Sequence, residues 1–241
     1  MKKFVLLLMS VLCLGLFSFL AKPKPKLLVF TKTAGYHHGS IPKGVEAIRK
    51  IGIEKGFDID TTADASLFTT KNLKHYAALV FLSTTGNLFD TLQKTALQQY
   101  VEKGGGIIGI HAATDCEYKW PWWGQTIGAY FESHPRQQKA TLNIVDAQHP
   151  STKELPTKWE RFDEWYNFKN INPDLHTLIT IDESSYQGGK NGNVHPVAWW
   201  QNVGKGRVFY TALGHTNESY SEPLFLQHLT GGIQFVLDGK K

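Results

Sequence analysis

Gly104-Gly-Gly-Ile-Ile-Gly-Ile-His-Ala-Ala-Thr-Asp115 is the stretch of this sequence that decides the fold. Its small apolar residues from Gly106 to Ile110 predict a strand that is buried on both faces. His111 follows this strand directly, and Asp115 comes four residues later. Ligands of open α/β sheets bind outside the carboxyl ends of the strands, so a site is expected here. The structural alternative is that His111 caps the strand and Asp115 caps a helix.

Length and composition indicate one globular α/β domain, expected over residues 27–241. Of the 241 residues, 41% are hydrophobic and 20% are charged, which is ordinary for a globular protein. Aromatic residues reach 12% and include seven Trp, more than a core requires. An aromatic excess is common at carbohydrate sites, and the alternative is a bulky core.

Residues 1–21 read as a secretory signal. Lys2 and Lys3 form a basic start, and an uncharged apolar run follows over residues 4–20. Ala21 suits the last position before cleavage, whereas Phe19 is bulky for the usual pattern. The alternative is therefore an uncleaved membrane anchor. Residues 22–26 form a basic Pro/Lys spacer. We expect an exported protein, periplasmic or secreted, that meets a membrane only through this segment.

The charge balance and the cysteine count exclude some classes of partner and of covalent bond. Without residues 1–21, the chain has 24 basic and 21 acidic residues, a net charge of +3. No basic block remains that would predict a nucleic-acid partner. Cys116 is then the only cysteine, so no internal disulfide is possible. Nothing in the sequence sets the oligomeric state.

The first half of the chain alternates apolar strands with helices. This alternation predicts a parallel, doubly wound sheet with helices on both faces. The expected strands are 27–30, 57–61, 78–82 and 106–110, and the expected helices are 41–55 and 88–102.

After about residue 140 the pattern changes to strands joined by turns. We expect this half to extend the sheet with antiparallel or mixed strands. The strand-like segments are 141–145, 160–168, 177–181, 194–201 and 207–212. A closing helix is expected over residues 224–237, interrupted by Gly231 and Gly232.

Several histidines lie where these strands end, which favours a shared site over coincidence. They are His38, His111, His134 and His215. Glu164 lies in a strand-like segment, where a charged side chain calls for a functional or structural explanation. Its alternative is a solvent-facing position in an edge strand.

Two kinds of chemistry fit these side chains. Histidine titrates near neutrality, so acid/base work with a carboxylate partner is plausible. Imidazole and carboxylate also suit a divalent metal such as Zn, Mn, Fe or Co. No His pair has HExxH spacing, so a metal site would have to be assembled from distant loops. The aromatic loop around Trp120, Trp122 and Trp123 could stack on sugar rings or merely pack down.

Six ordered motifs together resemble the ThuA-like family of bacterial trehalose utilisation, from Lys26 to Leu237. The motifs span residues 33–41, 109–115, 128–135, 163–166, 195–199 and 206–215. The first motif usually reads Tyr/Phe-Arg-His, so His37 replaces an arginine here.

The resemblance implies a fold similar to class I glutamine amidotransferases, a flavodoxin-like three-layer α/β sandwich. Those enzymes place a nucleophilic Cys on a sharp strand-to-helix turn. This chain has His111 at that point, and Cys116 comes several residues too late. Amidotransferase activity is therefore not expected, since fold does not fix function.

The resemblance also implies sugars oxidised at the 3-position. We expect acid/base or metal-assisted isomerisation, elimination or hydrolysis of a small-molecule sugar or oxidised glycoside. The expected catalytic residues are His111, Glu164 and Asp115. The expected substrate-binding residues are Tyr36, His38, Trp122, Trp123, Tyr166 and His195. The expected metal ligands are His111, His134 and His215. The alternatives are a non-catalytic carbohydrate-binding protein and a metal-storage or scaffold protein.

Overall fold

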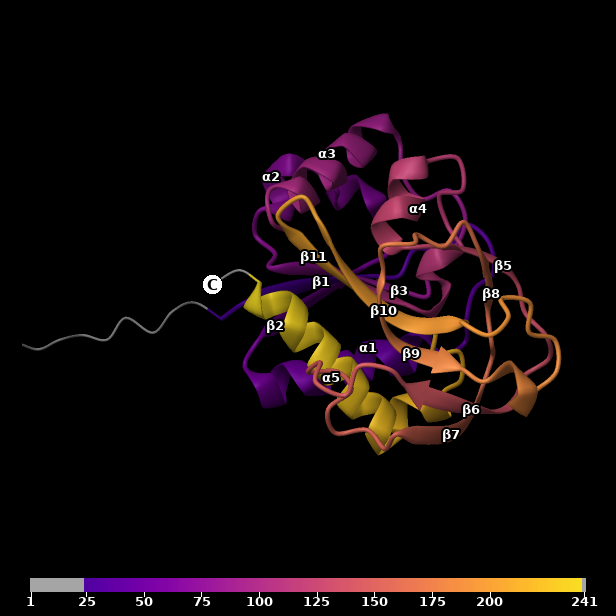
Figure 1. The fold of residues 1–241 in the computed structure, drawn as a ribbon. Coiled ribbons are helices and arrows are strands. Elements are labelled where there is room, and N and C mark those ends of the chain that lie inside the picture. Colours follow the sequence, from indigo (N-terminus) through magenta and orange to yellow (C-terminus); the bar gives the residue numbers. More distant parts are fainter. Residues whose placement is uncertain (1–23, 240–241) are drawn as a thin grey trace, which may run out of the picture.

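A computed structural model describes residues 24–239, and Figure 1 shows its three layers. A nine-stranded sheet forms the middle layer, in the order β2-β1-β3-β4-β11-β10-β9-β6-β7. The predicted signal or anchor, residues 1–21, lies outside the described residues. No helix within residues 24–239 is both long and apolar enough to span a membrane.

The parallel half of the sheet joins the first four strands to β11. Its strands are β1 (Lys26–Phe30), β2 (Asp58–Thr62), β3 (Ala78–Leu82), β4 (Gly106–Ile110) and β11 (Gly206–Thr211). All neighbours within this group pair in parallel. β3 and β4 are buried along their whole length, as expected of strands covered on both faces.

Helices cover both faces of the sheet (Figure 1). On one face lie α1 (Ile41–Lys55) and α5 (Pro223–Asp238). On the other lie α2 (Thr70–Leu73), α3 (Thr91–Glu102) and α4 (Pro121–Ile127). Short 3-10 turns follow several strands: η1 (Ala65–Leu67), η2 (His111–Thr114), η3 (Glu183–Ser185) and η4 (Glu218–Ser221).

The second half of the chain adds antiparallel strands beyond β11. They are β10 (Pro196–Val203), β9 (His176–Ile181), β6 (Gln138–Ile144) and β7 (Lys158–Asp163). A separate two-stranded sheet pairs β5 (Tyr130–Ser133) with β8 (Asn167–Lys169). The predicted α/β sandwich, with a parallel core and antiparallel additions, is confirmed.

The single strand expected over residues 160–168 was wrong. β7 alternates exposed and buried residues and ends at Asp163, and β8 begins at Asn167 in the other sheet. The physical reason is a run of consecutive buried residues, 163–168, which a half-exposed strand cannot accommodate. Glu164 therefore lies in the connection between two sheets.

Two other expectations fail locally. The aromatic segment expected as a loop contains helix α4, which begins at Pro121, a residue favoured in the first helical turn. The expected interruption of the closing helix is absent, because α5 runs unbroken through its glycine pair. A Cβ on Gly231 would meet the Pro150 carbonyl oxygen at 2.0 Å, and one on Gly232 would meet the Phe209 ring at 2.2 Å. Both glycines thus allow α5 to pack closely against Pro150 and against Phe209 of β11.

Strand direction places several loops at one edge of the sheet. Each step from β11 through β10, β9 and β6 to β7 is antiparallel, so β7 runs in the same direction as β11. The loops after β1, β4, β11 and β7 therefore share an edge. In a flat sheet, β7 would lie four spacings, roughly 19 Å, from β11. Asp163, at the end of β7, nevertheless accepts hydrogen bonds from the amides of Gly214 and His215. The sheet therefore curves back on itself.

Candidate functional site

Four side chains converge at this edge of the sheet. His38 follows β1, His111 follows β4, Glu164 follows β7 and His215 follows β11. Each offers one ligand atom, and these atoms all lie within 4.8 Å of one another. We call these four residues the histidine–glutamate cluster. His38, His111 and Glu164 are buried, and His215 is half-buried and the most exposed of the four.

His111 stands on a sharp turn. Its φ is +51°, in the left-handed region that residues other than glycine rarely adopt. Strain of this kind gathers at functional sites. The Nδ1 atom lies 2.8 Å from the carbonyl oxygen of Ala212, which can only accept. Nδ1 therefore carries a hydrogen in the neutral ring, and Nε2 presents its lone pair to the cluster.

No thiol reaches this turn. Cys116 is fully buried, and its Sγ lies 3.2 Å from the carbonyl oxygen of Ala113. Burial raises the pKa of the Cys116 thiol far above its ordinary value. This cysteine is therefore a small apolar core residue rather than a nucleophile.

Glu164 joins the histidines through both of its oxygens. Oε2 lies 3.4 Å from His111 Nε2 and 3.1 Å from His215 Nδ1. Oε1 lies 3.3 Å from Nδ1 of His134. Burial alone would raise the pKa of Glu164, but the hydrogen bonds and charges of His111 and His215 lower it well below its ordinary value. Glu164 is therefore a carboxylate at neutral pH.

His38 is held as a neutral ring. Burial, and then the neighbouring His111 and His215, lower the pKa of His38 to about 3. Its ring stands edge-on to His111 at 4.8 Å and to His215 at 5.2 Å between centroids. Its Nδ1 is buried without a hydrogen-bond partner. A buried polar atom without a partner needs an explanation, and a bound ligand supplies one.

His215 faces both its neighbours and the open side of the cluster. Its Nδ1 lies 3.1 Å from His111 Nε2, and its Nε2 lies 2.7 Å from the side-chain amide of Gln137. Burial alone would lower the pKa of His215, but the Glu164 carboxylate raises it.

Asp163 holds the loops that carry the cluster. Its fully buried carboxylate accepts hydrogen bonds from the backbone amides of Glu164, Gly214 and His215 at 2.9 to 3.1 Å. The guanidinium of Arg161 donates to it at 2.9 Å. Asp163 thus fixes Glu164 and His215 relative to one another.

The other predicted residues surround the cluster at different depths. His134 contacts Glu164 but is not among the four converging ligand groups. Asp115 accepts a 2.6 Å hydrogen bond from the Tyr118 hydroxyl, and burial raises its pKa. The Tyr166 ring packs on the His111 ring at 4.4 Å. His195 lies behind it, with Nε2 2.8 Å from the Tyr166 carbonyl oxygen.

The two tryptophans predicted to stack on sugar lie elsewhere. Trp123 is fully buried, packs on Phe81 and donates its indole hydrogen to the Ala113 carbonyl. Trp122 stacks on Trp120 at 4.8 Å. Within residues 24–239, neither ring contacts a ring of the cluster. The structure therefore places the Trp123 ring in the core, away from the cluster.

Tyr36 is the exposed aromatic ring beside the cluster. It is 65% exposed, and its ring stands edge-on to His38 at 4.8 Å. The structure thus brings together Tyr36, His38, His111, Glu164 and His215.

Sequence reasoning missed three supporting residues: Asp163, Gln137 and Tyr118. Asp163 carried a signal, since it is a second acid directly before Glu164 at the end of a strand. Neither Gln137 nor Tyr118 carried such a signal. Gln137 contacts His215, which is distant in the chain, and Tyr118 contacts Asp115 across a turn that the sequence did not predict.

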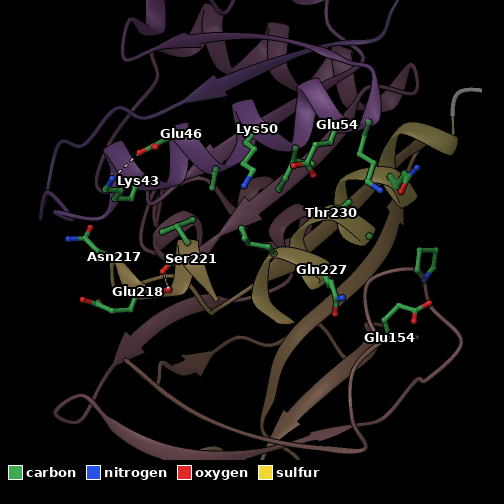
Figure 2. A pocket seen from close by; sticks show the side chains of 18 of the residues that line it. Lys43, Glu46, Lys50, Glu54, Glu154, Asn217, Glu218, Ser221, Gln227 and Thr230 are labelled. Carbon is green, nitrogen blue, oxygen red and sulfur yellow. Dashed lines mark hydrogen bonds and ion pairs between the residues drawn. The ribbon is translucent and has the colours of Figure 1, made fainter. Parts of the chain in front are cut away.

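A groove of about 900 Å³ lies apart from the cluster, between α1, η4 and α5 (Figure 2). Lysines and glutamates alternate along its α1 wall: Lys43, Glu46, Lys50 and Glu54. No residue of the cluster lines it. The groove is therefore not part of the candidate site.

The fold and the cluster define the class, a three-layer α/β protein with a histidine–carboxylate site at its strand ends. A family model, ThuA, described as trehalose utilisation, matches residues 26–236. The chain therefore belongs to the ThuA family, as its motifs predicted. No curated protein matches the sequence.

Solved structures share the fold. A ThuA-like protein from Bacteroides uniformis is 23% identical with a TM-score of 0.76, and the match covers 89% of this chain and 91% of that one. A ThuA-like protein from Parabacteroides merdae is 24% identical with a TM-score of 0.74, covering 90% and 91%. A cytoplasmic protein from Salmonella typhimurium is 14% identical with a TM-score of 0.63, covering 88% and 98%. At these identities the likeness concerns the fold alone.

Proposed function

We propose that this ThuA-family chain is an enzyme of carbohydrate metabolism that acts on sugars or 3-keto-glycosides by acid/base or metal-assisted chemistry. The observation that carries the proposal is the convergence of His38, His111, His215 and Glu164 at one edge of the sheet. The family description, trehalose utilisation, supports a sugar as the substrate class.

The two carboxylates near the site suit different roles. The hydrogen next to the carbonyl of a 3-keto sugar is acidic, so a base can remove it if the developing enolate oxygen is stabilised. The pKa of Glu164 is lowered, which makes it a weak base and a good ligand. The pKa of Asp115 is raised by burial, so Asp115 is the better base. We assign stabilisation of the carbonyl oxygen to the cluster. Proton removal is assigned to Asp115, which lies after the same strand as His111, outside the cluster, and accepts a hydrogen bond from the Tyr118 hydroxyl.

Because its Nε2 presents a lone pair to the cluster, His111 acts on the reacting oxygen only through a cation held there. Its Nε2 faces the cluster, and the Tyr166 ring packed on it fixes the imidazole plane. Tyr36 offers an exposed ring beside the cluster for the apolar face of a sugar.

Export is a separate proposal that rests on residues 1–21. A basic start followed by an uncharged apolar run supports a periplasmic or secreted protein, or one anchored by residues 4–20. Cell fractionation followed by amino-terminal sequencing of the purified protein tests it. Recovery in the cytosol with residues 1–21 intact would refute export.

Turnover of 3-keto-glucosides, including 3-keto-trehalose, followed by mass spectrometry tests the enzymatic proposal. We expect turnover by the wild-type chain and at least a hundredfold loss in His111→Ala. The control is His176→Ala, which removes a histidine that stacks on Trp200 on β10. Unchanged turnover in His111→Ala would remove this residue from the mechanism. Sugar binding without turnover by the wild type would refute the enzyme and favour the non-catalytic carbohydrate-binding alternative.

A further inference from the structure

We propose that the histidine–glutamate cluster is a divalent metal centre whose ligands are His38, His111 Nε2, His215 Nδ1 and Glu164 Oε2. The inference rests on the site of the proposed function and deepens it, because it selects the metal-assisted route over simple acid/base work. The expected ion is a first-row divalent cation such as Zn²⁺, Mn²⁺, Fe²⁺ or Co²⁺, since three imidazoles and one carboxylate suit this group.

The hydrogen-bond partners leave lone pairs facing one another. His111 donates its Nδ1 hydrogen to Ala212, so its Nε2 carries a lone pair. Gln137 Nε2 lies 2.7 Å from His215 Nε2, and a half-turn of the Gln137 amide presents its oxygen there instead. With the amide oxygen as acceptor, His215 donates from Nε2, and its Nδ1 also presents a lone pair.

These lone pairs and the carboxylate need a cation between them. His111 Nε2, His215 Nδ1 and Glu164 Oε2 lie 3.1, 3.1 and 3.4 Å apart. Three acceptors at such distances repel unless a positive charge lies among them, and one proton can bridge only one pair at a time. A metal ion satisfies all three at once.

The spacing fits a metal shell. Ligand atoms about 2.0–2.1 Å from a tetrahedral ion are separated by about 3.3–3.4 Å, close to the observed distances. His38 offers a nitrogen within 4.8 Å of the other three ligand atoms. His38 is also buried with an unpartnered Nδ1, which is the independent sign that this pocket is built for a ligand.

The geometry changes the predicted ligand set. His134 was expected as a ligand, but its Nδ1 lies 2.9 Å from the Pro135 carbonyl oxygen and 3.3 Å from Glu164 Oε1. Its Nδ1 hydrogen is therefore directed to these oxygens, and the ring contacts the far side of the carboxylate. His134 is a positioning residue for Glu164, like the partners that orient ligands in known metal sites.

Metal analysis of the purified full-length chain tests the proposal without any sugar. After chelator treatment, we expect one Zn²⁺ or Co²⁺ bound per chain in equilibrium dialysis, and ligand-field absorption bands when Co²⁺ binds. His111→Ala and the isosteric Glu164→Gln should each weaken binding at least a hundredfold. His134→Ala should keep the stoichiometry and weaken binding about tenfold. The control is His37→Ala, which removes an exposed imidazole next to His38.

The outcomes separate the metal from the sugar function. Circular dichroism identifies variants that fail to fold, and Glu164→Gln keeps the test decisive if His111→Ala is one of them. No stoichiometric binding by the wild type, or unchanged binding in folded Glu164→Gln, overturns the metal centre. Bound metal with no turnover of any 3-keto-glucoside supports the metal centre and refutes the enzyme. Turnover that survives complete metal removal overturns the metal-assisted route and leaves acid/base chemistry.

Discussion

Two groups of histidines in this protein share burial and unpartnered ring nitrogens but differ in their charged partners. The histidine–glutamate cluster gathers three imidazoles around a carboxylate at the strand ends. The second group, His149 and His228, packs against Phe209 of β11 and against α5. Among the described residues, its imidazoles hydrogen-bond Ser151 alone, His149 through the hydroxyl at 2.8 Å and His228 through the carbonyl oxygen at 3.0 Å. Within residues 24–239, neither of them contacts a carboxylate.

The comparison shows that burial alone does not make a histidine functional. Burial lowers the pKa of His149 to about 4 and that of His228 to about 3, as it does for His38. What distinguishes the cluster is a charged partner held by a second layer of hydrogen bonds. Asp163 and Arg161 supply this layer, whereas the His149 and His228 pair has aromatic neighbours instead.

The largest expected effect follows from removing the charge that holds the cluster. Asp163→Asn leaves the buried Arg161 guanidinium without its nearest counter-ion and puts an amide beside the Gly214 and His215 amides. Because an uncompensated buried charge is costly, we expect a loss of about 3 kcal/mol in the free energy of unfolding. Urea denaturation measures it.

The matched control is Asp60→Asn, which changes an exposed carboxylate paired with Lys26. A surface pair contributes little, so this variant should lose less than about 1 kcal/mol. If Asp163→Asn loses no more than Asp60→Asn, charge does not hold the cluster, and the contrast between the two histidine groups fails.

The parallel half of the fold could be predicted from sequence because its signals are local. Continuous apolar runs gave β1, β3 and β4 to within a residue, and the strand-end rule placed His111 and His215 at the site edge. Trp123 shows the limit of composition. Its aromatic character was visible, but the helix α4 that turns it into the core was not predicted.

Glu164 was expected as a partner of His111, but the contacts that bring it there could not be derived from sequence, because no local pattern encodes how a sheet curves. β7 lies four strands from β11 in the sheet, and the contacts that bring them together join Asp163 to residues 51 and 52 positions away. Sequence could therefore nominate Glu164 as a partner of His111, while the contacts and distances of its carboxylate had to come from the structure.

An intermediate effect concerns the second histidine group and pH. The pKa of His228 is lowered in the folded chain, so the unfolded chain binds a proton that the folded chain does not. Stability from this group is complete above about pH 6.5, falls as the pH is lowered, and levels off near pH 3. Between pH 6.5 and pH 5, proton binding linked to His228 should lower the free energy of unfolding by about 2 kcal/mol.

The variant that isolates this contribution is His228→Asn, whose amide can occupy the place of Nδ1. Its unfolding free energy should fall about 2 kcal/mol less than that of the wild type over this range in urea titrations at each pH. Parallel curves for the two proteins would show that folding leaves the pKa of His228 unchanged, and the picture of a neutral core pair would fail.

Replacing Tyr36 should have the smallest effect on stability. It also tests from which side a substrate reaches the cluster. The Tyr36 ring is 65% exposed and lies edge-on to His38, so Tyr36→Ala should change the unfolding free energy by less than about 0.5 kcal/mol. If sugars approach over this ring, the lost stacking should raise KM for a 3-keto-glucoside roughly three- to tenfold with kcat nearly unchanged, because the ring touches no reacting atom. Tyr36→Phe keeps the ring and should restore KM. Steady-state kinetics of the two variants tests this prediction. An equal KM in Tyr36→Ala and the wild type would mean that substrate enters from another side. A fall in kcat alone would mean that the ring orients His38 instead of binding sugar.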